Sequence, residues 1–204
     1  MNGYDSPSLR TEIGIAVTDS PRTHLNLRTP IALIALAMSL GLMATLTYLD
    51  QPLKRCMSPE GMISYEKAWY PKTADDIIKD WQSAGLIPRA ELQIYIDLPF
   101  LIAYPISIGL TCWFLAELLR DQGYRRPAFV GRLLAWGQAV AGVCDAIEDA
   151  FLFYMLRNPS ATTAMPISTT FTKIKFLLII LGLLYLFVAV ALLNVRNRTP
   201  AAER

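Results

Sequence analysis

Long runs of residues without a charged side chain restrict the fold of this chain more than any other feature. Residues 30–49 and 176–195 each contain 20 consecutive uncharged residues, and residues 98–116 contain 19. A helix rises about 1.5 Å per residue, so about 20 residues cross the roughly 30 Å hydrocarbon core of a bilayer. Composition agrees, because only 18% of the 204 residues are charged, against about 25% in soluble domains. The sequence therefore predicts an integral membrane protein.

A fourth segment, residues 133–156, is long enough to span but is interrupted by three acidic residues. Those acids leave open a re-entrant or interfacial segment instead of a span. We favour a span, because an odd number of helices would place the arginines of 120–132 and of 196–198 on opposite sides of the membrane. The expected fold class is all-α, a four-helix transmembrane bundle with spans at about 30–49, 94–119, 131–156 and 172–195.

The arginines predict the orientation of this bundle. With both termini cytoplasmic, the short inner loop 120–132 holds four arginines, and further arginines flank the first and last spans. An excess of Lys and Arg in short loops favours the cytoplasmic side. The prediction is a multi-pass protein with a flexible cytoplasmic tail at 1–28, a four-span membrane domain at 29–196 and a short cytoplasmic tail at 197–204.

A cleaved signal peptide is the alternative interpretation of the first apolar run. Its 20 residues exceed the usual apolar length of about 7–15, and the following LTYLD lacks a small-residue cleavage site. We therefore expect an uncleaved first span.

The long segment between the first two spans, residues 50–93, is expected to be an ordered and partly helical extracytoplasmic segment. Thr73 followed by Asp76 is typical of a helix start, and Gly85 is typical of a helix end. The apolar side chains between them share one face, so this helix should lie on the membrane surface or cap the bundle. Those side chains are Ile77, Ile78 and Trp81.

Three acids in the third span are the main candidates for a functional site. Asp145, Glu148 and Asp149 are spaced i, i+3 and i+4, so they share one helical face. Small and polar residues continue that face toward the start of the helix, which predicts that it looks into the bundle and not into lipid. Charged groups at membrane depth are costly unless they are paired or hydrated, so they indicate a site.

Residues from two other spans should reach the same depth. Asp145 lies roughly 18 Å from the inner end of its helix, in the outer part of the bilayer. Asp97 begins the second span from the outside, and Lys173 and Lys175 begin the fourth. Tyr104 falls near the Asp97 face and would add a hydroxyl group. The sequence thus predicts that four acids and two lysines converge from three helices.

Three chemical roles for this cluster remain open. It could be a structural network in which Lys173 and Lys175 pair with the acids. It could hold a divalent cation such as Mg²⁺, Ca²⁺ or Mn²⁺ through hard carboxylate oxygens. It could instead bind and release protons or a small cation, because a buried carboxyl group with a raised pKa can do so.

Other function classes find little support in the sequence. The net charge of +2 is too small for a nucleic-acid binder. The one histidine, His24, and three cysteines without metal-like spacing exclude a His-rich or Cys-rich metal centre and a disulfide scaffold. No catalytic signature such as HExxH, GxSxG, a Walker loop or CxxC occurs, so a membrane enzyme that uses paired carboxylates is the third and least supported interpretation.

Two functional hypotheses remain. In the first, the protein binds a cation or protons at the acidic cluster in the outer half of the bundle. In the second, it is an accessory or scaffold protein whose cluster is structural and whose outer segment docks on a membrane protein partner. Complete neutralisation of the acids by the two lysines would favour the second hypothesis. An acidic pocket without counter-charge would favour the first.

Two segments resemble a known kind of protein. YIDLPFLIAYPISIGL, with Asp97 and Tyr104, and VCDAIEDAFLFYML, with Asp145 and Glu148, are similar to the paired aspartate-bearing helices of small four-span bacterial membrane proteins that carry no assigned function. The likeness covers the second and third spans and the WQSAG segment before them. It implies a four-span architecture and a location in the plasma (inner) membrane, without implying an activity.

Overall fold

The computed structural model describes residues 25–198, and the side chains of residues 30–195. The predicted tails at 1–28 and 197–204 therefore lie mostly outside the described residues. Within this range the chain is helical and contains no strand, which confirms the all-α prediction. The elements in chain order are α1 (Leu25–Asp50), η1 (Gln51–Leu53), α2 (Met62–Glu66), α3 (Pro71–Ser83), α4 (Ile87–Asp121), α5 (Arg125–Arg157), η2 (Pro159–Ala164) and α6 (Met165–Arg198).

The four long helices extend beyond the expected spans. α1 begins at Leu25, inside the tail predicted at 1–28, because nothing in LNLRT interrupts a helix before Pro30. α6 likewise extends from Met165 to Arg198, well beyond the predicted span at 172–195. Helices of this length exceed what a bilayer core requires, so their ends reach past the apolar region.

Three segments are long and apolar enough to cross a membrane: Pro30–Leu53, Ile87–Asp121 and Pro159–Val195. Many of their large apolar side chains are exposed on the outside of the helices, including Leu33, Leu40 and Phe187. In water such surfaces would be a liability, whereas lipid chains cover them without cost. These helices support the prediction that the chain is a membrane protein. α5 is not among the three, because its acids interrupt the apolar run.

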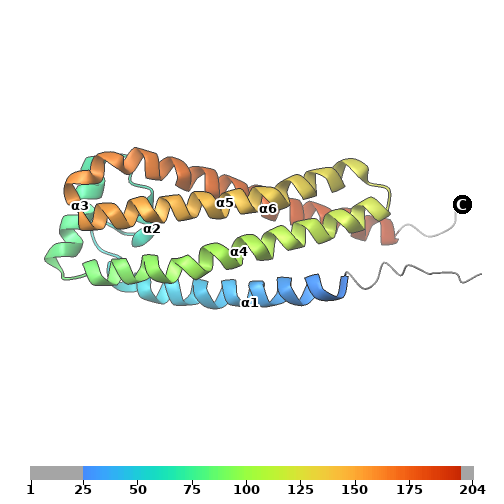
Figure 1. The fold of residues 1–204 in the computed structure, drawn as a ribbon, viewed down its shortest axis with the longest axis horizontal. Coiled ribbons are helices and arrows are strands. Elements are labelled where there is room, and N and C mark those ends of the chain that lie inside the picture. The colour runs from blue at the N-terminus through green and yellow to red at the C-terminus, as the bar shows by residue number, and fades with distance from the viewer. Residues whose placement is uncertain (1–24, 199–204) are drawn as a thin grey trace, which may run out of the picture.

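Helices α4, α5 and α6 pack side by side along much of their length, and α1 packs against α4 (Figure 1). Glycines allow the close approach of α5 to its neighbours. A Cβ atom on Gly142 would lie 3.0 Å from Pro105 Cγ of α4, and one on Gly131 would overlap the Tyr185 ring of α6. Small residues at crossing points are typical of helices that pack in membranes.

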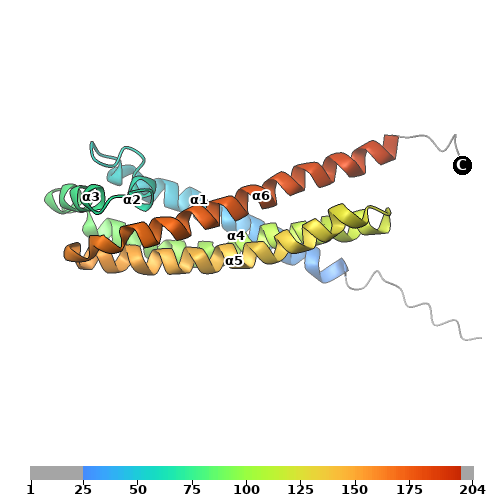
Figure 2. The same ribbon diagram turned by 90° about the horizontal axis from the view of Figure 1, so that it is seen from above.

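The short helices α2 and α3 cover one end of this bundle (Figure 2). Ile77, Ile78 and Trp81 of α3 are fully buried with Leu152 and Met155 of α5 in one apolar cluster. The indole Nε1 of Trp81 also donates hydrogen bonds to the Leu53 carbonyl at 3.1 Å and to Ser58 Oγ at 3.0 Å. The segment 50–93 thus contains the expected amphipathic helix, whose apolar face packs onto the end of the bundle.

The start of that helix differs from the prediction. α3 begins at Pro71, two residues before Thr73, and Tyr70 precedes it without a side-chain cap. Proline suits the first helical position because its missing N–H would have no partner there. The predicted end is confirmed, since Gly85 has a φ of 68°, a conformation that favours glycine.

Candidate functional site

The centre of the acidic cluster is the buried ammonium group of Lys175 on α6. Its Nζ lies 2.5 Å from Asp145 Oδ1, 2.7 Å from Glu148 Oε2 and 3.8 Å from Glu66 Oε2. The side chains of Asp145 and Glu148 are almost completely buried. One cation thus faces carboxylates from α2 and α5, as an ammonium group with three N–H donors allows.

A second group of carboxylates lies on the other side of Asp145. One oxygen each from Asp97, Asp145 and Asp149 lie within 4.8 Å of one another. Asp97 comes from α4 and the other two come from α5, so the two helices contribute to one group. Asp149 is 6% exposed, and its Oδ2 has no hydrogen-bond partner in the described part of the chain. Neither Asp97 nor Asp149 forms an ion pair with any described residue.

Lys173, the other lysine expected in the cluster, lies elsewhere. It is exposed, and its Nζ lies 3.8 Å from the centre of the Trp69 ring, a cation–π contact. Successive helical residues are about 100° apart, so Lys173 and Lys175 point in nearly opposite directions. Only one of them can face the bundle interior, and the prediction that both pair with the acids is wrong for Lys173.

Glu66 is a further member of the cluster, which no pattern in the sequence indicates. It is the last residue of the five-residue helix α2, in the middle of the long segment after α1. Two threonines of α6 hydrogen-bond to the backbone around Glu66. Thr172 Oγ1 donates to the Glu66 carbonyl at 3.4 Å, and Thr169 Oγ1 donates to the Ala68 carbonyl at 3.1 Å. The segment therefore folds back onto α6, a contact that helical periodicity does not predict.

Burial has a clear electrostatic effect on Glu66. Loss of hydration raises the pKa of this carboxyl group, and the nearby carboxylates of Asp145 and Asp50 raise it further. The ammonium groups of Lys175 and Lys67 act in the opposite direction, but they do not offset the burial. Glu66 therefore favours its protonated form more than an exposed glutamate does.

Tyr104 lies on the cavity side of α4, near Asp97. The residue is 5% exposed, and its Oη has no hydrogen-bond partner among the described residues. Tyr104, Asp97, Asp145 and Asp149 all line the same cavity. The structure thus brings together all the predicted acids, Tyr104 and Lys175, and adds Glu66.

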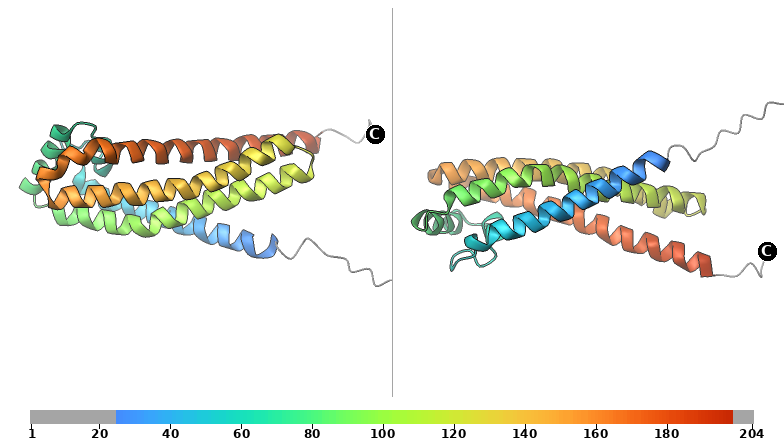
Figure 3. Two further views of the ribbon diagram at one scale, coloured as in Figure 1. Left: turned by 45° about the horizontal axis from the view of Figure 1, so that its top comes forward. Right: turned by 90° about the horizontal axis from the view of Figure 1, so that it is seen from below.

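This cavity has a volume of about 820 Å³ and lies between α1 and α6. Residues of α2, α4 and α5 also line it. α1 and α6 have no extensive contact with each other; they cross in the view from below, and beyond the crossing they diverge toward the end away from α2 and α3 (Figure 3). Polar residues line the end near α2, and apolar side chains line the remainder. The carboxylates are therefore located at one end of a long apolar cavity.

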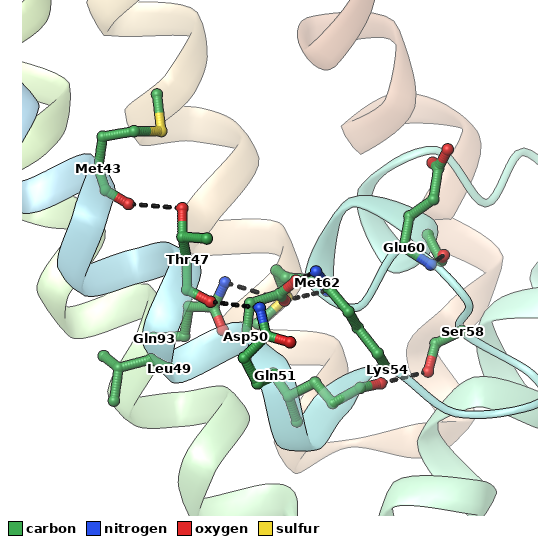
Figure 4. A network of polar contacts seen from close by, with 12 residues as sticks. Met43, Thr47, Leu49, Asp50, Gln51, Lys54, Ser58, Glu60, Met62 and Gln93 are labelled. Carbon is green, nitrogen blue, oxygen red and sulfur yellow. Dashed lines mark hydrogen bonds and ion pairs between the residues drawn. The ribbon is translucent and has the colours of Figure 1, made fainter.

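A polar network closes the same end of the cavity at the C-terminus of α1 (Figure 4). Asp50 Oδ1 accepts hydrogen bonds from the Met62 backbone N–H at 2.7 Å and from Gln93 Nε2 at 3.3 Å. Lys54 Nζ lies 3.9 Å from the other carboxylate oxygen of Asp50. This network ties α1 to α2 and α4, so the segment that carries Glu66 has a defined position over the cluster.

The donor set suits a cation. Among the described residues, Lys175 is the one lysine that forms ion pairs within a group of five carboxylates: those of Glu66, Asp97, Asp145, Glu148 and Asp149. Lys54 and Lys67 line the same cavity, but they pair with Asp50 and Glu60. Asp97, Asp145 and Asp149 could hold a metal ion, since carboxylate oxygens are ligands of Mg²⁺, Ca²⁺ and Mn²⁺. Asp145 already bonds to Lys175, so Asp97 and Asp149 have the most oxygens to offer.

Comparison of the chain with protein-family models, with curated proteins and with solved structures finds no match. Any function assigned to this protein therefore has to come from the chemistry of the cluster and its cavity.

Proposed function

We propose that this protein is a four-span protein of the plasma (inner) membrane that binds a cation or protons at its acidic cluster. The observation that carries the proposal is the excess of carboxylates over lysine at the cavity. Asp97 and Asp149 form no ion pair with a described residue, and the Oδ2 atom of Asp149 has no hydrogen-bond donor there. A buried carboxylate without a partner is costly, and such groups mark ion or proton sites in membrane proteins.

The four-span topology is supported by the position of α5. Its 33 residues would extend about 50 Å, and it packs along both α4 and α6, which are apolar enough to span. An acidic helix can cross a bilayer when its charged face is buried against other helices. With both termini cytoplasmic, α2 and α3 would lie outside, and the cluster would lie in the outer half of the bundle.

The accessory-protein hypothesis differs in the role of the cluster. It requires the acids to be neutralised within the protein, with the outer segment left to dock on a membrane protein partner. The ion pairs of Lys175 with Asp145 and Glu148 fit that hypothesis, but Lys173 contributes no second counter-charge. The imbalance favours cation or proton binding over a purely structural network.

Thermal unfolding of the purified protein in detergent tests the proposal. Wild type, Asp149→Asn and a control, Asp121→Asn, would be compared with chelator and with Mg²⁺, Ca²⁺, Mn²⁺, Na⁺ or K⁺, at several pH values. Asp121 is an exposed acid at the far end of α4, so its change leaves the cluster intact. A bound cation should raise the Tm of wild type and of Asp121→Asn, because binding stabilises the folded state.

Asp149→Asn should abolish that rise while leaving the cation-free protein as stable as wild type or more so, because it removes repulsion between carboxylates. If protons are the ligand, metals should have no effect, and Asp149→Asn should change the pH dependence of Tm. If wild type and Asp149→Asn show the same pH dependence of Tm, and no cation raises the Tm of wild type, the proposal is refuted and the structural role is favoured.

A further inference from the structure

The cavity beside the acidic cluster has two chemically different parts, and their combination points to a class of ligand. Away from the cluster its walls are mostly apolar, with the hydroxyl groups of Ser39 and Ser107 as exceptions. The apolar side chains come from α1, α4 and α6: Leu36, Leu40, Met43, Ile108, Ile179 and Leu183. Its volume of about 820 Å³ is within the roughly 300–1,000 Å³ that is usual for small-molecule sites. A bare metal ion or a proton would use none of this apolar space.

The lysines that line the polar end already have acidic partners: Lys54 lies 3.9 Å from Asp50, and Lys67 lies 3.0 Å from Glu60. The Oδ2 atom of Asp149 and the Oη atom of Tyr104 are both buried, line the cavity and have no hydrogen-bond partner among the described residues. Asp97 lies beside them without an ion pair, and Lys175 is already occupied by Asp145 and Glu148. A ligand that fits here supplies N–H donors and a positive charge.

The position of the cavity indicates where a ligand would come from. Its side walls, α1 and α6, have no extensive contact with each other, and beyond the point where they cross they diverge toward the end away from α2 and α3 (Figure 3). Both helices expose large apolar side chains outward, among them Leu33 and Phe187. In a bilayer the space between such helices faces lipid chains, so an amphiphile could enter sideways without crossing water.

We propose that the cavity binds a cationic amphiphile of the alkylammonium class, taken up from the bilayer between α1 and α6. The ammonium group lies among Asp97, Asp149 and Tyr104, and the alkyl chain occupies the apolar part of the cavity. This inference rests on the proposed function, because it uses the same carboxylates as the cation site. An amphiphile with an anionic head is excluded by repulsion from those carboxylates.

Binding of dodecylammonium tests this inference, with the protein in nanodiscs of zwitterionic lipid and Tm measured against ligand concentration. Dodecanol and dodecanoate share the chain without the positive charge, and methylammonium shares the charge without the chain. Dodecylammonium should raise Tm at lower concentration than methylammonium, while dodecanol and dodecanoate should have little effect. Asp149→Asn should weaken dodecylammonium binding about tenfold or more, because hydrogen bonds to charged groups contribute at least that factor.

A pair of tryptophan variants on α6 tests the location of the chain. Ile179→Trp would fill the apolar part of the cavity, while Leu184→Trp, at an exposed position that does not line it, is the control. Ile179→Trp should abolish the advantage of dodecylammonium over methylammonium, and Leu184→Trp should preserve it. The Tm of each variant without ligand verifies that it is folded.

The outcomes separate this inference from the proposed function. If methylammonium or a metal ion stabilises the protein but dodecylammonium binds no better, the alkylammonium inference is wrong and the cation site stands. Dodecylammonium binding that Ile179→Trp leaves unchanged also refutes the inference, because the chain then lies elsewhere. If no cation, small or amphiphilic, stabilises the protein, the alkylammonium inference is wrong and the proposed function is reduced to proton binding, which the pH dependence of Tm in wild type and Asp149→Asn then decides.

Discussion

Lys175 Nζ donates a 2.5 Å hydrogen bond to Asp145 Oδ1, and both side chains are almost completely buried. This pair joins α6 to α5 inside the bundle. Lys175 forms ion pairs with Asp145 and Glu148. Asp97 and Asp149 line the cavity instead and form no ion pair with a described residue. Lys175 therefore neutralises only one part of the cluster.

Removal of the lysine should destabilise the protein strongly. Lys175→Met leaves buried carboxylates without their cation, a change that typically costs about 3–5 kcal/mol. Adding Asp145→Asn to Lys175→Met should recover part of this loss, because one unpaired charge is removed with its partner. Chemical or thermal unfolding in detergent measures both variants.

Lys173→Met is the matched control, because Lys173 is two residues away on α6 and is exposed. It loses only a surface cation–π contact with Trp69, worth about 0.5–1 kcal/mol. Equal destabilisation by the two lysine changes would contradict the central position of Lys175.

Glu66 should make stability depend on pH. Its pKa is raised in the folded protein, mainly by burial, so its contribution to stability is complete below the unfolded pKa of about 4.3. That contribution is lost as the pH rises through the folded pKa, because the folded state must then carry a charge on a side chain that is only 16% exposed. Glu66→Gln stays neutral, so its Tm relative to wild type should increase as the pH rises above about 4.3. A constant difference between the two proteins across this pH range would show that the Glu66 pKa is not raised.

The Asp50 network predicts the effect of a glycine substitution. Gly61 has a φ of 65°, and a Cβ atom there would overlap the Asp50 carboxylate, which Met62 and Gln93 hold in place. Gly61→Ala should therefore cost more than the roughly 1–3 kcal/mol of the strained backbone alone, whose φ of 65° is combined with a ψ of −131°. Gly85→Ala is the control, since Gly85 has a similar φ of 68° but no atom within 4 Å of the added Cβ. Comparable unfolding free energies for the two variants would show that Asp50 moves freely.

The proposed topology predicts the accessibility of Cys56. This cysteine is exposed in the segment between α1 and α2, whereas Cys112 and Cys144 are buried. A membrane-impermeant thiol reagent should label wild type in intact cells, and Cys56→Ser should abolish the labelling. If labelling appears only after the cells are permeabilised, Cys56 lies on the cytoplasmic side and the bundle has the opposite orientation.

Local patterns in the sequence were sufficient for the helices and for the inward-facing acids. The uncharged runs predict long helices because a backbone within lipid has to satisfy its own hydrogen bonds. The i, i+3, i+4 spacing of Asp145, Glu148 and Asp149 puts them on one face beside Gly142 and Gln138, and small residues direct that face toward neighbouring helices. Both features depend only on neighbours within a few turns of one helix.

The tertiary structure decided which groups complete the cluster. Lys173 and Lys175 precede the same apolar run, so only the rotation of α6 against α5 determines that Lys175 faces inward and Lys173 stacks on Trp69. Glu66 joins them because the segment after α1 folds back onto Thr169 and Thr172, contacts between residues more than 100 positions apart in the chain. The cavity likewise depends on the angle between α1 and α6. Rotation, fold-back and crossing angle are set by packing between distant segments, and no periodicity in the sequence encodes them.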